Sequence, residues 1–136
     1  MASHLHWMLI KNTHCFLMKR KGGEQFSRDP LNLKGKNCFK YCGLVHKKAI
    51  GIKQERGGKG VYMLTKKAGY DHKPRQAIVR TKFVRGQRRS LQKIRNFVCR
   101  QNYRRELKML ALRRASGMMQ KNKSKTPAAS SQPKKN

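Results

Sequence analysis

Short runs of alternating hydrophobic and polar residues fill the first part of the chain, a pattern typical of half-buried β-strands. Leu5, Trp7 and Leu9, for example, are separated by His6 and Met8. We expect a second strand to return beside the one that contains these residues. Up to residue 27 the pattern predicts strands at residues 5–10, 15–18 and 25–27, with turns at residues 12–14 and 21–23.

Pro30 interrupts this alternation, because proline restricts the residue before it and has no amide donor. A polar, basic loop is expected to follow at residues 31–37. Alternation then resumes, which favours further short strands. In order, the pattern predicts a strand-like segment at 39–46, a strand at 49–53, a basic hairpin tip at 56–60, a strand at 61–67, a loop at 70–75 and a strand or extended approach at 77–84.

The hydrophobic spacing changes in the last third of the chain to the period of an α-helix. Leu91, Ile94, Phe97 and Val98 would lie on one face of a helix, and Ser90 is positioned to cap its start. This helix is expected to hold basic residues on its remaining surface.

A second helix is predicted from about residue 104 to residue 116, after an interruption at Asn102. Gly117 is expected to end it, because glycine favours helix C-termini. The face of this helix that is expected to be buried contains Leu107, Leu110 and Ala111.

The C-terminal tail has a different composition, with lysines among Ser, Pro and Asn and no apolar residue larger than alanine after Met119. Such a segment cannot bury enough apolar surface to fold, so we expect it to be disordered. The predicted fold class is therefore α+β, with a small N-terminal antiparallel β-sheet followed by two basic amphipathic helices and a disordered C-terminal tail. The expected division is one folded domain at residues 1–118 and a lysine-rich tail at residues 119–136.

Charge changes the picture from fold to function. The 136 residues include 35 Lys and Arg against 5 Asp and Glu, a formal net charge of +30, and the cations are spread through the segments expected to fold. A surface this positive repels itself, so a dense anionic partner is expected. Nucleic acid presents one phosphate charge about every 1.7 Å of duplex axis and releases counterions when these charges are neutralised. We therefore predict that the chain binds nucleic acid.

The candidate RNA-binding residues form two groups, a basic loop and a set of arginines. In the loop, Tyr41 is either a core residue or a platform for an unpaired base. The arginines favour ordered contacts, since a guanidinium group binds phosphate through two hydrogen bonds. A merely solvated helix face would interleave acids as partners, and here only Glu106 is available. The predicted residues are Lys34, Lys36, Asn37, Lys40, His46, Lys47, Lys48, Lys59, Arg75, Arg80, Arg85, Arg88, Arg89, Arg95, Arg100, Arg104, Arg105, Arg113 and Arg114.

Metal binding is the alternative role for Cys38, Cys42 and His46, whose spacing resembles that of zinc ligands. On a strand, residues four apart are separated by about 13 Å, too far for the ligands of one tetrahedral ion. The set would work only on a loop or helix, with a fourth ligand such as Cys15. We predict no metal and no cofactor.

Catalysis and membrane insertion are also not expected. The acids are scattered without pairing, and no Cys–His or Ser–His arrangement has a recognisable pattern, so the chain is not predicted to be an enzyme. The longest apolar run, at residues 5–10, is far shorter than the ~20 residues of a membrane span and is unlike a secretory signal. The cysteines are expected to be reduced thiols of an intracellular protein.

Several stretches resemble a known family. They are SHLHWM at residues 3–8, FLMKR at 16–20, NLKGKNCFKYCGLVH at 32–46, GKGV at 58–61, KP at 73–74, VRT at 79–81 and YRRELKMLALRRAS at 103–116. In this order, over about residues 1–118, they are similar to the eukaryotic large-subunit ribosomal protein 28 family.

The resemblance implies a structural component of the cytosolic 60S subunit, with an rRNA-binding domain that contacts large-subunit rRNA and neighbouring 60S proteins and catalyses nothing. It implies no membrane partner, no homo-oligomer, and passage through the nucleus and nucleolus during assembly. The alternative is a nuclear ribosome-assembly factor, because a related N-terminal domain occurs in the Mak16 family of pre-ribosome proteins.

Overall fold

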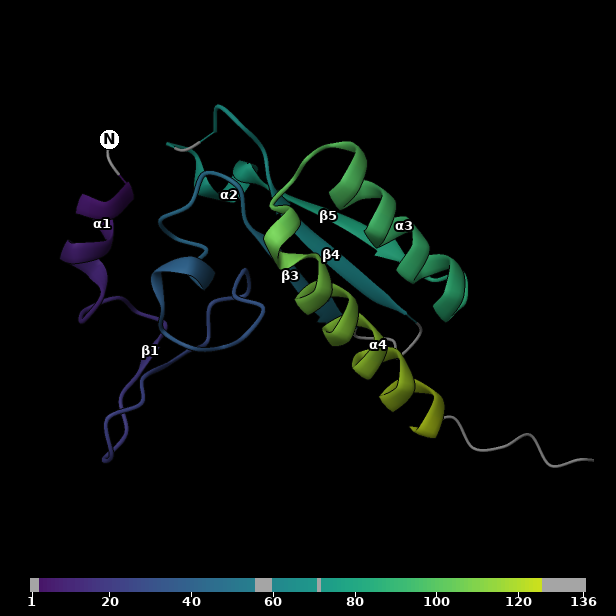
Figure 1. Cartoon of the computed structure of the whole chain (residues 1–136), viewed down its shortest axis with the longest axis horizontal. Coiled ribbons are helices and arrows are strands. Elements are labelled where there is room, and N and C mark those ends of the chain that lie inside the picture. Colours follow the sequence, from purple (N-terminus) through teal and green to yellow (C-terminus); the bar gives the residue numbers. More distant parts are fainter. Residues whose placement is uncertain (1–2, 56–59, 71, 126–136) are drawn as a thin grey trace, which may run out of the picture.

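A three-stranded antiparallel sheet with two long helices on one face forms the larger part of the molecule (Figure 1). The computed structural model describes residues 3–55, 60–70 and 72–125. Its elements are, in order, α1 (Ser3–Ile10), β1 (Leu17–Met18), β2 (Phe26–Ser27), the 3₁₀ turn η1 (Phe39–Tyr41), β3 (Ile50–Gln54), β4 (Val61–Lys66), α2 (Pro74–Ala77), β5 (Ile78–Phe83), α3 (Gln87–Arg100), the 3₁₀ turn η2 (Arg105–Leu107) and α4 (Lys108–Lys125).

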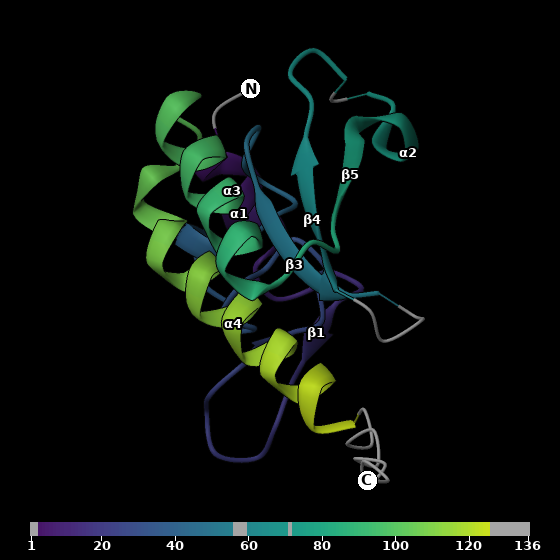
Figure 2. The same cartoon turned by 90° about the vertical axis from the view of Figure 1, so that its right-hand side faces the viewer.

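The sheet is a meander in which β4 lies between β3 and β5, and both pairs are antiparallel. Because side chains alternate along a strand, Ile50, Ile52, Val61, Met63 and Phe83 all point to the face that the helices cover. This face is the main hydrophobic core of the protein. Figure 2 shows α3 and α4 together on that side of the sheet.

The two helices contribute to this core at positions four residues apart, which lie above one another on a helix surface. In α3 the buried residues are Ser90, Ile94 and Val98. In α4 and the turn before it, Leu107, Ala111, Ala115 and Met119 are buried, and the two alanines are completely inaccessible. Their small side chains let α4 lie close to β3 and α3.

Tyr103 joins the helices to one end of the sheet. Its hydroxyl accepts hydrogen bonds from the amides of Ala49 (3.2 Å) and Lys66 (3.0 Å). Its single proton is within reach of the carbonyl oxygens of both residues, at 3.3 and 3.0 Å. Burial raises the pKa of this phenol, so it remains a neutral donor and acceptor. The hydroxyl therefore provides hydrogen-bond partners for the backbone groups where β3 begins and β4 ends.

The N-terminal part of the chain is held by polar contacts more than by a core. Buried Asp29 accepts hydrogen bonds from the amides of Leu31 and Gly43, each at 2.9 Å, which ties two distant loop segments together. A Cβ atom at Gly43 would collide with the side chain of Leu31. Leu31 itself forms a second, smaller cluster with Ala49 and Leu64 on the other face of the sheet.

The fold class agrees with the sequence-based expectation of small antiparallel sheets followed by two basic helices, and the predicted strands at 49–53 and 61–67 are present as β3 and β4. The segment at 77–84, predicted as strand or extended, contains strand β5. The predicted hairpin tip at 56–60 falls mostly on residues outside the described part of the chain, as does the tail from residue 126 onward.

The first predicted strand was wrong, because residues 5–10 belong to helix α1. His4 stacks on Phe39 at 4.5 Å between ring centroids, and Trp7 contacts the same ring edge-on at 6.1 Å. Side chains three apart share a face in a helix and lie on opposite faces of a strand, so only the helix places both on one ring. The second predicted strand, which was expected to pair with residues 5–10, is present as β1 and pairs with β2 instead.

Four other local predictions were wrong. The segment at 39–46 begins with the turn η1 and contains no strand, and part of the loop at 70–75 belongs to α2. Ser90 does not cap α3, which begins three residues earlier; its hydroxyl instead donates to the carbonyl of Gly86 at 2.7 Å. Gly117 does not end the last helix, which continues to Lys125.

Ile94 provides the most direct test of this core. It is fully inaccessible and lies between the sheet and α4, so Ile94→Ala should lower the free energy of unfolding by about 2–5 kcal/mol through the cavity it leaves. Gln92→Ala, on the exposed side of the same helix, should change it by less than about 0.5 kcal/mol. Urea unfolding of the free protein measures both values, and equal effects of the two variants would contradict the packing of α3 on the sheet.

Candidate nucleic-acid interface

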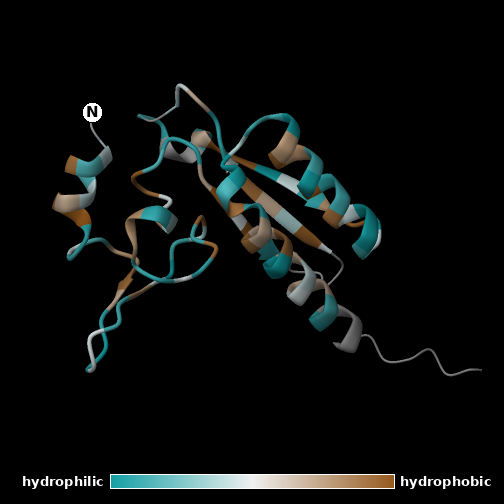
Figure 3. Ribbon diagram, in the orientation of Figure 1, coloured by the Kyte–Doolittle hydropathy of each residue, from teal (hydrophilic) through white to brown (hydrophobic). Residues whose placement is uncertain are grey.

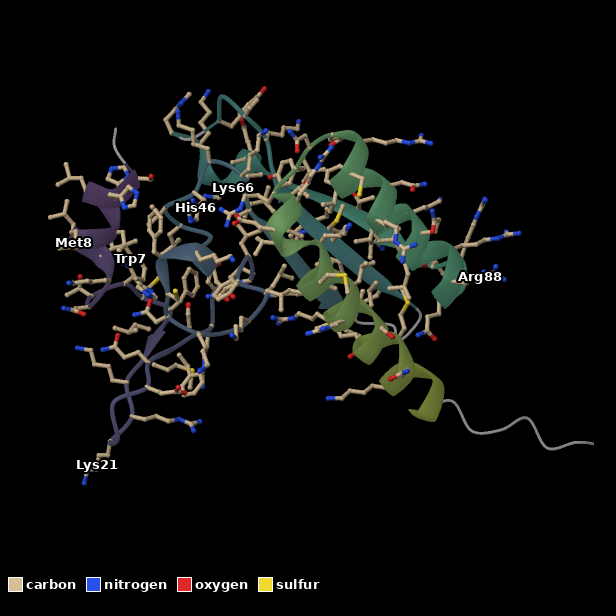
Figure 4. All side chains as sticks on the ribbon, viewed as in Figure 1. Trp7, Met8, Lys21, His46, Lys66 and Arg88 are labelled. Carbon is tan, nitrogen blue, oxygen red and sulfur yellow. The ribbon has the colours of Figure 1, made fainter. Side chains whose placement is uncertain are left out.

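The exposed face of α3 carries a set of cations without an acid among them. Because the helix buries every fourth residue from Ser90 to Val98, the face opposite these residues turns toward solvent. Five basic residues occupy these exposed positions: Arg88, Arg89, Lys93, Arg95 and Arg100. In Figure 3 most of the ribbon of this helix has hydrophilic colours, and Figure 4 shows Arg88 extending away from the body of the protein.

Acidic side chains in the described part of the chain are already engaged elsewhere. Glu24 pairs with Lys36 at 2.9 Å, Glu55 with Lys82 at 3.2 Å and Glu106 with Arg104 at 2.7 Å. The hydrogen bond from Lys36 and its charge lower the pKa of the Glu24 carboxyl, so this acid is ionised at neutral pH. The cations of α3 therefore face solvent with their charge uncompensated by these acids.

A small hollow lies where β5 passes into α3. It has a volume of about 220 Å³ and is lined by three basic residues, Lys82, Arg85 and Lys93, together with Phe83, Val84 and Ser90. Lys82 and Lys93 were not among the residues predicted from the sequence. The alternation along β5 and the helical period of α3 are the signals that would have placed them outward.

The basic loop around residues 31–48 is shaped by Asn32, which is almost fully buried. Its side-chain oxygen accepts hydrogen bonds from the amides of Lys34 (3.1 Å) and Gly35 (2.8 Å), and its nitrogen donates to the carbonyl of Lys36 (2.9 Å). This turn leaves the Lys34 side chain exposed, with its ammonium 5.5 Å from the Tyr41 ring centroid. Tyr41 packs against the main core, the first of the two roles considered for it.

Two predicted RNA-binding residues of this loop have side chains that form hydrogen bonds within the protein. Asn37 donates to the carbonyl of Lys11 and to the side chain of Gln25, both at 2.8 Å. The His46 Nε2 atom lies 2.8 Å from the carbonyl of Phe39. Burial, as the largest cause, lowers the pKa of His46, so the imidazole is predominantly neutral at pH 7.

Arg104 is likewise directed inward. Its Nη2 donates to the carbonyl of Lys40 at 2.7 Å and its Nη1 approaches that of Lys48 at 3.5 Å. Its Nε lies 2.7 Å from Glu106 in an ion pair whose angles fall outside hydrogen-bond geometry. The side chain is only 12% exposed. Arg104 therefore joins the helical region to the basic loop.

Arg114 makes the second connection of this kind. Its Nη1 donates to the carbonyls of Asn32 (2.9 Å) and Leu33 (2.6 Å), across more than 80 residues of sequence. Desolvation by burial lowers the pKa of this guanidinium group. The contact fixes helix α4 to the turn at Asn32.

The sequence-predicted residues thus fall into three classes. Exposed ones are Lys34, Lys40, Lys47, Lys48, Arg80, Arg85, Arg88, Arg89, Arg95, Arg100, Arg105 and Arg113. Partly buried ones are Lys36, Asn37, His46, Arg104 and Arg114. Lys59 and the side chain of Arg75 lie outside the described part of the structure.

The cysteines do not form a metal site in the described ranges, where no group of three or more His, Cys, Asp or Glu side chains is arranged to hold an ion. Cys42 is buried, whereas Cys38 is exposed. In the same ranges, no helix combines the length and the apolar composition that crossing a bilayer requires.

Comparison with known proteins gives a consistent result over nearly the whole chain. The model of the Ribosomal L28e protein family matches residues 5–121. The large ribosomal subunit protein eL28 of Schizosaccharomyces pombe is 30% identical over 132 residues, which cover 94% of this chain and 98% of that protein. The protein of the same name from Caenorhabditis elegans is 40% identical over 67 residues, 48% of this chain and 52% of the relative.

The contrast between inward and outward arginines is testable in the free protein. Arg104→Ala removes charged hydrogen bonds to loop carbonyls and should lower the free energy of unfolding by about 1.5–3 kcal/mol. Arg100→Ala should leave stability unchanged or raise it slightly, because it relieves repulsion between like charges. Urea unfolding of both variants at the same ionic strength makes the comparison. Equal destabilisation by the two variants would mean that the assignment of inward and outward arginines is wrong.

Proposed function

The chain belongs to the Ribosomal L28e protein family, and from this premise we propose that it is a structural constituent of the cytosolic 60S subunit that binds large-subunit rRNA. The proposal rests on the family match for the assembly and on the cationic surface for the ligand. In this role the protein supports translation by stabilising folded rRNA and performs no chemistry of its own.

The observation that carries the RNA-binding part is the exposed face of α3. Five cations on one helix of 14 residues, with no acid in residues 87–100, would repel one another in solution. Phosphates of RNA would convert this repulsion into attraction and release bound counterions. The arginines can each bind a phosphate through two hydrogen bonds, which suits an ordered contact.

The hollow between β5 and α3 is the best-defined phosphate subsite in this proposal. Lys82, Arg85 and Lys93 line it from a strand, a turn and a helix, and the sheet register directs the Lys82 side chain toward the opposite face of the sheet. Lys82 also pairs with Glu55, but its side chain is 67% exposed and remains accessible to a ligand. Lys34, Lys40, Lys47 and Lys48 of the basic loop supply a second cationic region.

Arg104 and Arg114 have a different part in this proposal. They hold the loop and the helices in one arrangement through the carbonyls of Lys40 and Asn32, so they act on RNA through the position of the basic loop. Neighbouring 60S proteins are the other proposed partners. We expect the protein to act as a single copy and not as a homo-oligomer.

A nuclear assembly factor is the alternative function considered from the sequence, and the family match favours the subunit constituent. The two differ in where the chain is found. As a constituent it should remain in purified 60S particles after a high-salt wash, having passed through the nucleolus during assembly. Its presence only in nucleolar precursor particles would favour the alternative.

Three cations of α3 test the proposed interface. If about eight phosphates are engaged, the logarithm of the affinity for a large-subunit rRNA fragment should fall with the logarithm of salt concentration at a slope near −6. Replacing Arg88, Arg89 and Lys93 together with Gln should weaken binding and make that slope shallower by about 2–3.

Filter binding across a series of KCl concentrations measures these slopes. The control variant replaces Gln92 and Asn96 with Ala on the same helix, and it should bind as the unaltered protein does. A slope shallower than −2 for the unaltered protein would contradict phosphate binding as the main contribution. An unchanged slope for the triple variant would mean that α3 does not contact the RNA phosphates.

A further inference from the structure

The outer face of the β3–β4–β5 sheet, opposite the helices, is a second candidate surface. Side-chain alternation directs Lys53, Tyr62, Leu64, Arg80 and Lys82 to it. Figure 2 shows that α3 and α4 lie on the other side of the sheet, and that the short helix α2 lies near one end of it. This face is therefore open to a partner over part of its area.

Among the residues that the structure describes, the chain covers one end of this face. A Cβ atom at Gly51 would collide with the carbonyl oxygen of Pro30, so the loop passes directly over that position. Leu31 from the same loop buries Leu64. Tyr62, two residues before Leu64, packs against this small cluster with one part of its side chain and remains partly exposed.

Tyr62 lies between two lysines in the sheet register. Lys53 on β3 and Lys82 on β5 are its direct cross-strand partners, at the roughly 4.5–5.5 Å Cβ separation typical of such pairs. Arg80 lies diagonally from it on β5 and is exposed. Glu55 pairs with Lys82 at 3.2 Å, so one of the three cations is already partly compensated.

An aromatic ring flanked by cations fits an unpaired nucleotide. Any base can stack on a tyrosine, which contributes about 1–3 kcal/mol per base, and the cations on either side can reach the flanking phosphates. A duplex keeps its bases stacked inside, so it would contact only the cations. A charged face of this kind is a poor match for a protein neighbour that is itself basic.

We propose that this outer sheet face binds a single-stranded segment of RNA, with one base stacked on Tyr62 and the adjacent phosphates near Lys53 and Arg80. The inference rests on the proposed RNA-binding function and adds a ligand class to it. Helix α3 would bind RNA phosphates without regard to strandedness, whereas the sheet face would require an unpaired nucleotide. The two surfaces are therefore separable by the form of RNA that each prefers.

The test compares two RNA probes of equal length, an unstructured 12-nucleotide strand and a perfectly paired duplex, with the full-length chain. Tyr62→Leu keeps an apolar side chain but removes the ring, and it should weaken single-strand binding about 5- to 150-fold while duplex binding stays within about twofold. Tyr62→Phe keeps the ring and should bind both probes as the unaltered protein does.

Tyr70→Leu is the matched control. Tyr70 is also an exposed tyrosine beside a lysine, with the Lys67 ammonium 5.5 Å from its ring centroid, but it lies outside the sheet. Its replacement should leave both affinities unchanged. An equal loss for Tyr70→Leu and Tyr62→Leu would overturn the proposal, since the effect would then belong to any exposed tyrosine.

Photocrosslinking of the unaltered protein to a uridine-containing strand provides a readout that does not depend on how the variants fold. A crosslink at Tyr62 is expected, and crosslinks confined to α3 would overturn the proposal.

If the unaltered protein bound neither RNA, the proposed function itself would fail. If Tyr62→Leu abolished entry into 60S particles but kept single-strand affinity, the face would bind a protein neighbour, which also contradicts the proposal.

Discussion

Repulsion among like charges is the constraint on which the rest of this structure depends. With 35 basic and 5 acidic residues, the chain cannot neutralise its cations with its own carboxylates. The folded state is held together by the apolar core between the sheet and helices α3 and α4, where Ile50, Ile52 and Ile94 are completely inaccessible. Helical spacing keeps the α3 cations on the faces away from that core, so folding does not require any of these charges to be buried.

Backbone carbonyls accept the hydrogen bonds of the two inward arginines, and only Arg104 also pairs with a carboxylate, that of Glu106. Arg104 and Arg114 donate to carbonyls of the basic loop at Lys40 and Asn32. A carbonyl carries no net charge, so the contacts between these arginines and the loop need no acid in the loop itself. Buried Asp29 also bonds to the backbone: its carboxylate accepts hydrogen bonds from the amides of Leu31 and Gly43. The positive loop surface is thus positioned by polar contacts, and its lysines remain outside.

The parts of the fold that the sequence predicts are those fixed by local periodicity. Strands β3 and β4 and the buried face of α3 follow directly from alternation and helical spacing. Helix α1 could not be identified in this way, because its apolar residues fit either period over so short a run, and the decisive contact of His4 and Trp7 is with Phe39. The inward arginines were also unpredictable, since their acceptors lie 64 and 82 residues away in sequence. The positions of Lys53 and Lys82 beside Tyr62 can be recognised only once the strand register is known.

The dependence of thermal stability on simple salt tests the central claim most directly. If uncompensated repulsion limits the free fold, screening should raise the melting temperature as NaCl increases, since the Debye length falls from about 10 Å at 0.1 M to about 3 Å at 1 M. A gain of 1 kcal/mol would raise it by roughly 4 °C in a domain of this size. Circular dichroism of the RNA-free protein across this range measures the change. A melting temperature that falls or stays constant would contradict the claim, because attractive ion pairs would then balance the repulsion.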